Sequence, residues 1–250
     1  MAKRERIDKR LVDLGLAETR TKAQALVMSG VVLINERPAA KSSDLVSDRD
    51  IVRIKSGTAL PYVGRGGLKL EKALKEFDIR PAEYVCLDVG ASTGGFTDCL
   101  LQNGAKFVYA IDAGTNQLDW KIRSDSRVEA REKVNARYLK PDDFPEPFDL
   151  IVMDVSFISI TKILPALADL IKENGRMVSL IKPQFEAGRG EVGKGGIVKD
   201  PETHKRVIKE CLNAAETLGF TSIGVTESPI RGATGNTEFL ACFEFRRSED

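Results

Sequence analysis

The sequence predicts an α/β protein with a doubly wound, mostly parallel sheet of seven strands whose last strand is antiparallel, preceded by a small α+β domain. Two observations support this fold. From Tyr84 onward, strand-like apolar runs alternate with helix-like segments. The last two strand-like runs are separated by only about ten residues, including Pro229, Gly232 and Gly235. That connection is too short for a crossover helix, so a hairpin is expected.

Residues 1–60 are predicted to form the small domain. Ile7, Leu11 and Leu14 mark one face of a first helix that Gly15 ends. A second helix is expected to be capped by Thr19 or Thr21 and to stop at Gly30, with its apolar side at Ala23, Leu26 and Val27. Strands are expected over residues 31–34 and 51–54, and a turn over 35–38.

Residues 61–82 are predicted to connect this domain to the sheet domain, residues 83–247. Segment 56–65 reads as a linker because it contains Gly and Pro, and Leu70, Ala73, Leu74 and Phe77 predict a helix that begins near Gly66. The expected strands are 84–89, 106–111, 127–130, 148–153, 176–181, 219–226 and 238–245, and the expected helices lie near 95–103, 115–123, 159–172 and 202–217. A reversed last strand on a mostly parallel sheet is the usual layout of methyltransferases rather than dehydrogenases.

Composition excludes several classes of protein. Of the 250 residues, 42% are hydrophobic and 30% are charged, which is typical of a globular chain. The longest stretch without a charge, residues 23–35, has 13 residues, whereas a membrane-spanning helix needs about 18. The N-terminus is charged from Lys3 onward and lacks the apolar segment of a secretory signal. We therefore expect a cytoplasmic protein without a membrane partner.

Cysteine and histidine usage agree with this location. The cysteines lie in apolar runs without C-x-x-C spacing and are predicted to be reduced core residues: Cys86, Cys99, Cys211 and Cys242. A single histidine, His204, excludes His-rich metal sites, and no metal site is expected. His204 lies in a polar helix start and is expected to be exposed.

Charge is distributed unevenly along the chain. Residues 1–69 hold 14 basic and 8 acidic residues, a net charge of +6, and the remainder has a net charge of −5. This asymmetry favours a polyanionic partner for the small domain. An ordinary solvated basic surface is the alternative that charge alone leaves open.

The segment from Val85 to Thr97 reads as a strand, a glycine-rich turn and a helix start. Its G-x-x-x-G-G spacing is neither the dinucleotide fingerprint nor a P-loop. Asp88 at the strand end would repel a pyrophosphate but suits a cationic amine, such as that of S-adenosylmethionine. Asp112 ends the next strand, 22 residues after Gly90, where a carboxylate can accept hydrogen bonds from both ribose hydroxyls. Asn135 is expected to reach the adenine edge. The residues expected to bind the cofactor are Asp88, Gly90, Ala91, Ser92, Thr93, Gly94, Gly95, Phe96, Asp112, Ala113, Asn135 and Asp154.

Two charged residues close apolar strands and are the candidate catalytic pair. Asp154 follows residues 150–153 and Lys182 follows residues 177–181, which places both at the carboxyl edge of the sheet. The D-V-S-F run is not the D/N-P-P-Y motif of exocyclic-amine methyltransferases, and no Pro-Cys or Thr-Cys closes a strand. The reaction class that remains is deprotonation of a hydroxyl, followed by direct attack of its oxygen on a sulfonium methyl group. Lys182 is expected to act as base or to stabilise the alkoxide as a cation, and both roles stay open.

The small domain resembles a known RNA-binding family. The spacing R-I-D-K-R-L-V-x-x-G-L-x-x-T-R-x-x-A-x-x-L-V-x-x-G-x-V-x-I-N is similar to that of the S4 domain. The resemblance implies salt-dependent contacts between basic side chains and RNA phosphates. With Arg65 of the linker added, the expected RNA-binding residues are Arg4, Arg6, Lys9, Arg20, Lys22 and Arg65.

Five motifs are spread over nearly the full length of the chain: Y-V-G-R-G-G-L-K-L-E, D-V-G-A-S-T-G-G-F-T-D, M-D-V-S-F-I-S, I-K-P-Q-F-E and G-N-T-E-F. With these motifs, the sheet domain resembles FtsJ-type ribose 2′-O-methyltransferases, and the whole chain resembles the TlyA or hemolysin-A family of ribosomal RNA cytidine 2′-O-methyltransferases. The resemblance implies a catalytic tetrad of Lys69, Asp154, Lys182 and Glu238. By composition alone, Lys69 and Glu238 read as surface charges. The sequence departs from the family at S-T-G-G-F, where other FtsJ-type enzymes have A-P-G-G-W, and at Gly64, where many relatives have Ser.

This resemblance implies S-adenosylmethionine-dependent 2′-O-methylation of a cytidine in ribosomal RNA. Because the chain starts close before Arg6, as the shorter members do, the large subunit is the expected substrate and the small subunit is the second candidate. No obligate protein partner is evident from the sequence. The alternatives are a membrane-lytic protein and a catalytically inactive S4-type RNA-binding factor.

Overall fold

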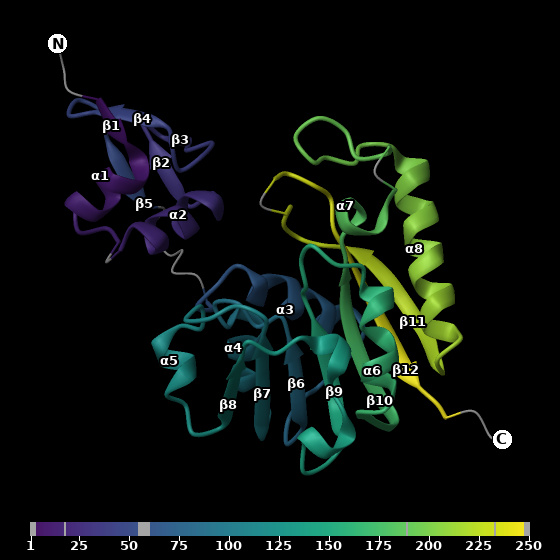
Figure 1. Ribbon diagram of the computed structural model, residues 1–250. Helices are drawn as coiled ribbons and strands as arrows, with labels where there is room; N and C mark the ends of the chain where they lie inside the picture. Colours follow the sequence, from purple (N-terminus) through teal and green to yellow (C-terminus); the bar gives the residue numbers. More distant parts are fainter. Residues whose placement is uncertain (1–3, 18, 55–60, 189, 233, 248–250) are drawn as a thin grey trace. The chain divides into compact units, whose positions relative to one another are not determined.

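The computed structural model describes residues 4–17, 19–54, 61–188, 190–232 and 234–247. The chain forms two compact units, Met1–Pro61 and Tyr62–Asp250 (Figure 1). Residues 56–60 of the expected linker lie outside the described residues.

The N-terminal unit is built from short elements. They are β1 (Arg4–Arg6), α1 (Ile7–Asp13), α2 (Arg20–Met28), β2 (Val32–Ile34), β3 (Arg37–Pro38), β4 (Leu45–Ser47) and β5 (Val52–Ile54). Strands β1 and β4 pair antiparallel, and β3, β2 and β5 form a second sheet in that order. Strands β1, β3 and β4 were not expected from the sequence, because runs of two or three residues carry no recognisable alternation.

The helix pair of this unit packs largely as predicted. Ile7, Leu11, Ala23 and Val27 are buried together, and the Thr19 side chain accepts a hydrogen bond from the backbone amide of Lys22 and caps α2. The prediction for Leu14 was wrong. Helix α1 ends at Asp13, and the Leu14 side chain is 44% exposed.

The second unit contains a seven-stranded sheet in its described part, with the order β11-β12-β10-β9-β6-β7-β8. Its strands are β6 (Val85–Val89), β7 (Phe107–Asp112), β8 (Val128–Glu132), β9 (Phe148–Met153), β10 (Ile171–Ile181), β11 (Phe220–Glu227) and β12 (Phe239–Phe245). Strand β12 runs antiparallel to β10 and β11, whereas the pairs from β10 to β8 are parallel. The predicted sheet and its reversed last strand are confirmed.

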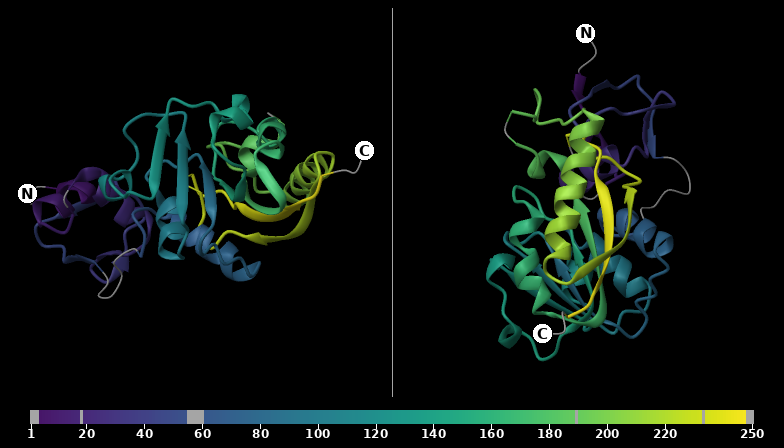
Figure 2. Two further views of the ribbon diagram at one scale, coloured as in Figure 1. Left: turned by 90° about the horizontal axis from the view of Figure 1, so that it is seen from below. Right: turned by 90° about the vertical axis from the view of Figure 1, so that its right-hand side faces the viewer.

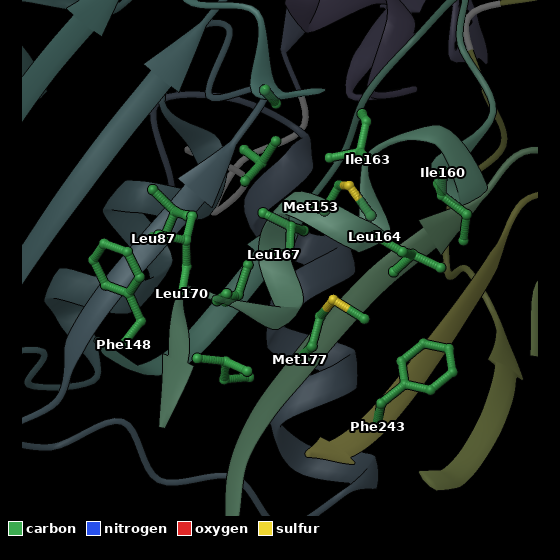
Figure 3. Close-up of a cluster of buried hydrophobic side chains, with 14 of the residues drawn as sticks. Leu87, Phe148, Met153, Ile160, Ile163, Leu164, Leu167, Leu170, Met177 and Phe243 are labelled. Carbon is green, nitrogen blue, oxygen red and sulfur yellow. The ribbon is translucent and has the colours of Figure 1, made fainter. Parts of the chain in front are cut away.

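Helices cover both faces of this sheet (Figure 2). Helices α3 (Gly66–Glu76) and α4 (Gly95–Gln102) pack on one face, and α6 (Leu164–Ala168) and α8 (Pro201–Glu216) pack on the other. Strand residues alternate between these faces, so Cys86 packs under α3 and α4 while Leu87 joins the opposite cluster shown in Figure 3. All four cysteines are buried and unpaired, as predicted. In the described segments, no helix has the length and apolar character needed to cross a membrane.

Two predicted helices are shorter in the structure. The expected helix 159–172 is replaced by the 3-10 helix η3 (Ile160–Lys162), by α6 and by the start of β10. Ile171 pairs with Phe148 of β9, so sheet pairing overrides the helical spacing of this apolar run. The expected helix 115–123 is reduced to α5 (Trp120–Arg123), because Asn116 adopts a positive φ of 53°.

The remaining short elements lie in the connections after β8 and β10: η1 (Ala136–Tyr138), η2 (Pro141–Asp143) and α7 (Pro183–Glu186). His204 lies in α8 and is half-buried rather than exposed, contrary to the prediction. Its Nε2 lies 3.0 Å from the carbonyl oxygen of Val198, and its ring packs edge-on against Phe239.

Candidate active site

Four charged side chains meet at the carboxyl edge of the sheet. Asp154 follows β9, Lys182 follows β10, Lys69 comes from α3 and Glu238 directly precedes β12. Lys182 Nζ lies 2.7 Å from Asp154 Oδ1. Lys69 Nζ donates to Asp154 Oδ2 at 3.1 Å and to Glu238 Oε2 at 2.8 Å. The structure thus brings the four predicted residues together as a chain of alternating charge.

The direction of β12 explains why Glu238 reaches this edge. Because β12 is antiparallel to β10, Phe239 at its start pairs with Ile181 at the end of β10. The Glu238 carboxylate packs against Gly232, where an added Cβ would lie 2.5 Å from Glu238 Oε1. A hairpin in place of a crossover connection therefore positions one of the four charges.

Burial and charge pairing determine the electrostatics of the group. Lys69, Lys182 and Glu238 are only 8%, 7% and 3% exposed. Burial raises the pKa of Asp154, but the ammonium groups of Lys69 and Lys182 outweigh it and hold this pKa below its usual value. Burial lowers the pKa of Lys69, but Asp154 and Glu238 outweigh that effect and raise it. Lys69 is therefore a persistent cation between two carboxylates.

Local reasoning missed Lys69 and Glu238, which only the family resemblance supplied. A usable signal existed for Lys69. It lies four residues before Ala73 and so shares the buried face of α3, where a charge needs a partner. Nothing local to Glu238 marks it, because its partner Lys69 is 169 residues away in the sequence.

A cavity of about 490 Å³ opens beside Asp154. It lies at the carboxyl ends of β6, β7 and β9, the usual place for a ligand in an open α/β sheet. Of the predicted cofactor residues, those that line it are Gly90, Ser92, Asp112, Ala113, Asn135 and Asp154.

The second half of the glycine-rich turn faces the protein itself. A Cβ on Gly95 would lie 2.9 Å from the backbone nitrogen of Gly67 and 3.0 Å from the carbonyl oxygen of Gly64. A Cβ added at Gly64 would contact the Thr93 side chain, and one added at Gly66 would contact the Phe96 ring. Gly94 adopts a φ of +93°, and a Cβ added there would contact the Leu118 side chain. Ala91 is buried, and its backbone amide donates a hydrogen bond to the carbonyl oxygen of Ile111. These predicted residues shape the turn and are not among the described residues that line the cavity.

Asp88 lies behind the cavity wall. It is 0% exposed, and its Oδ2 accepts a hydrogen bond from the Thr97 hydroxyl at 2.6 Å. Its Oδ1 is buried and has no hydrogen-bond partner among the described residues. Burial raises the pKa of Asp88 to about 7. An unpartnered carboxylate oxygen of this kind suits a cationic amine.

Two further side chains present polar atoms to the cavity. Asp112 accepts backbone hydrogen bonds from Ser92 and Gly114 at 2.8 and 2.6 Å, which fix the carboxylate while each oxygen keeps a further lone pair. Asn135 Oδ1 accepts a hydrogen bond from the backbone amide of Arg137. The side-chain nitrogen of Asn135 is therefore the group oriented for other contacts. At Gly90, an added Cβ would lie 2.7 Å from the carbonyl oxygen of Asp154, so only glycine fits. These residues fit an adenosine-containing cofactor.

The predicted RNA-binding residues differ in their contacts and in their exposure. Arg6 and Arg20 converge on the buried Asp8, with nitrogen–oxygen distances of 2.8 and 3.1 Å. Hydrogen bonds from Arg6, Gln24 and Arg20 hold the pKa of Asp8 well below its usual range. Lys9 lies 3.5 Å from Glu5. Arg4 and Lys22 are exposed, and Arg65 is partly buried at the start of α3.

The Tyr62–Asp250 unit matches a family model. Residues 62–245 match the model of the FtsJ-like methyltransferases. This chain belongs to that family. Residues 5–52 match the S4 domain model, so the family member carries an S4 domain before its methyltransferase domain.

Similar proteins align with nearly the whole chain. The chain is 44% identical to the 16S/23S rRNA (cytidine-2′-O)-methyltransferase TlyA of Mycobacterium tuberculosis, over 96% of this chain and 90% of the relative. It is 44% identical to hemolysin A of Brachyspira hyodysenteriae, over 95% and 99% of the two chains. A solved structure described as a hemolysin from Streptococcus thermophilus superposes with a TM-score of 0.78 at 46% identity, covering 99% of this chain and 90% of the other.

Proposed function

We propose that this protein transfers the methyl group of S-adenosylmethionine to the ribose 2′-hydroxyl of a cytidine in ribosomal RNA. The large subunit is the primary substrate in this proposal, and the small subunit is the second candidate. The observation that carries the proposal is the buried chain of alternating charge from Lys182 through Asp154 and Lys69 to Glu238, beside a cavity that fits an adenosine-containing cofactor. The activity named for the similar TlyA supports it.

When bound, S-adenosylmethionine supplies the methyl group as an electrophile. Asp112 would accept hydrogen bonds from the ribose hydroxyls of the cofactor, and Asp88, which lies behind the cavity wall, would place a negative charge near its amine. Lys182 first releases a proton to solvent, and in its neutral form it takes the proton of the substrate hydroxyl as the oxygen–methyl bond forms and the sulfur–methyl bond breaks. Asp154 holds Lys182 in position at 2.7 Å, and Lys69 holds Asp154 and Glu238. Fixed geometry of this kind lowers the activation free energy of such a transfer by roughly several kcal/mol.

An exposed aromatic ring offers a site for the target base. The Phe157 side chain is 91% exposed, lines the cavity and lies 5.1 Å from the Phe185 ring, centroid to centroid. Its φ of +65° is costly for a bulky residue, which indicates that the position of the ring matters. A cytosine base turned toward the cavity would stack on it.

The S4 domain supplies affinity for the RNA backbone through its basic side chains. Ribosomal RNA as substrate and four buried, unpaired cysteines together favour a cytoplasmic location.

Methyl transfer from labelled cofactor to purified ribosomal subunits, followed by mapping of the modified nucleotide, tests the proposal. We expect label at a cytidine 2′-hydroxyl, with none transferred by Asp154→Ala. Absence of label on either subunit would refute the proposal.

The name of the similar hemolysin A gives a second candidate, membrane lysis. Dye-filled liposomes test it directly. Dye release by both wild type and Asp154→Ala would support lysis, because that activity would not need the charge chain.

A further inference from the structure

A serine hydroxyl touches the Lys182 amine. Lys182 Nζ donates to Ser156 Oγ at 2.8 Å and lies 2.7 Å from Asp154 Oδ1. The centroid of the Phe185 ring is 5.8 Å away. Ser156 comes two residues after Asp154, and both of these acceptors line the cavity. The nitrogen that they share therefore lies at the edge of the cavity.

The two lysines of the charge chain have different partners. Lys69 Nζ contacts two carboxylates, those of Asp154 and Glu238. Lys182 Nζ contacts one carboxylate and one neutral hydroxyl. A hydroxyl holds an amine in place without adding a second negative charge. Of the two lysines, Lys182 is therefore the one that a neutral group orients beside the cavity.

The directions of the bonds around Nζ give the hydroxyl a specific task. A neutral lysine amine has two N–H bonds and one lone pair in a tetrahedral arrangement. If Asp154 and Ser156 accept both N–H bonds, the lone pair takes the remaining direction. Without the serine acceptor, the amine rotates about its Cε–Nζ bond and the lone pair samples several directions. The acceptor pair thus orients the group that receives the proton.

We propose that Ser156 is a positioning residue for the methyl transfer, which acts by accepting a hydrogen bond from Lys182 and directing its lone pair toward the ribose 2′-hydroxyl. This role rests on the proposed function. Lys182 first loses one proton to solvent, and the ribose proton then moves from the ribose oxygen to the neutral Nζ, while Ser156 keeps its own proton throughout.

The loop that carries Ser156 has other supports, so the hydroxyl is not needed for folding. The Glu186 carboxylate accepts the Ile160 amide at 2.9 Å. Ser159 Oγ lies 2.7 Å from Thr161 Oγ1 and caps η3. The Asp154 amide donates to the Val89 carbonyl at 3.0 Å. Loss of the Ser156 hydroxyl should therefore leave the loop in place.

Three variants of the full-length protein test the role: Ser156→Ala, Ser156→Thr and, as a matched control, Ser159→Ala, which removes a hydroxyl of the same loop that does not contact Lys182. Single-turnover methylation of purified large subunits gives the rate at saturating RNA and the RNA concentration at half-maximal rate. Calorimetry gives the affinity for S-adenosylmethionine, and thermal unfolding gives the Tm.

We expect Ser156→Ala to lower the maximal rate by on the order of 10-fold to 100-fold, the usual effect of a misplaced reacting group. Half-maximal RNA concentration, cofactor affinity and Tm should stay at wild-type values. Ser156→Thr keeps the hydroxyl and should restore most of the rate, and Ser159→Ala should keep the wild-type rate although its Tm falls with the loss of the η3 cap.

A Ser156→Ala rate within twofold of wild type would overturn the role of Ser156 and leave the proposed function intact. An equal loss in Ser159→Ala, or a loss matched by weaker cofactor binding, would assign Ser156 a merely structural part. If the wild type methylates neither subunit, the proposed function fails and this role fails with it.

Discussion

Lys69→Met removes the cation between two buried carboxylates while it keeps most of the side-chain volume. Lys69 Nζ lies 3.1 Å from Asp154 Oδ2 and 2.8 Å from Glu238 Oε2. With an effective dielectric constant of about 20, these contacts amount to about 5 and 6 kcal/mol of gross attraction. The cost of desolvation offsets much of this, so we expect a net loss of about 3–5 kcal/mol in the free energy of unfolding.

The loss should depend on pH in a definite direction. Lys69 and Lys182 together hold the folded-state pKa of Asp154 below its usual value, and removal of Lys69 leaves only one of these two ammonium groups. A lowered carboxyl pKa contributes stability above the unfolded pKa of about 4, and this stability is lost as pH falls. The variant loses part of that contribution, so it should be closest to wild type at acidic pH and most destabilised near pH 8.

Denaturant unfolding at several pH values measures this effect. Far-UV circular dichroism, together with the fluorescence of Trp120, the only tryptophan, follows the methyltransferase domain, which contains Trp120. Adding Glu238→Gln to Lys69→Met removes one unpaired carboxylate and should recover part of the loss. A destabilisation below about 1 kcal/mol at pH 8, without pH dependence, would refute the reasoning that Lys69 compensates two buried charges.

Four further predictions concern cofactor, catalysis and RNA. Asp112→Ala should weaken S-adenosylmethionine binding by roughly 1.5–3 kcal/mol, because a charged acceptor of two hydroxyls is lost; unchanged affinity by calorimetry would contradict this. Burial raises the pKa of Asp88 to about 7, and a bound amine favours its ionised form, so cofactor affinity should increase as pH rises from 6 to 8 and be flatter in Asp88→Asn. Lys182→Arg and Lys182→Ala should both lower single-turnover methylation, by on the order of 10²–10⁴, with cofactor binding retained; partial activity of the Arg variant alone would indicate charge stabilisation instead. Arg20→Gln should reduce the salt slope of RNA binding by about one, with Tm preserved because Arg6 and Gln24 still donate to Asp8; an unchanged slope would exclude a phosphate contact by Arg20.

Several features followed from local pattern. Apolar runs ending in Asp112, Asp154 and Lys182 identified the strand ends, and parallel strands bring such ends to one edge. The short connection before the last strand predicted its antiparallel direction, which β12 confirms. Local pattern failed where pairing competes with helical spacing, as at Ile171, because the sequence shows the spacing and not the strand beside it.

By itself, the sequence determined the alternation of strands and helices, the reversed last strand and the charges at strand ends, since each depends on residues near one another in the chain. Only the tertiary structure decided that Lys69 lies between Asp154 and Glu238, which come from segments 85 and 169 residues away. It also decided that Asp88 is sealed behind the cavity and that Ser156 contacts Lys182. The physical reason is that the charge state and direction of a buried polar group depend on the partners that the fold brings to it, and those partners lie far away in the sequence.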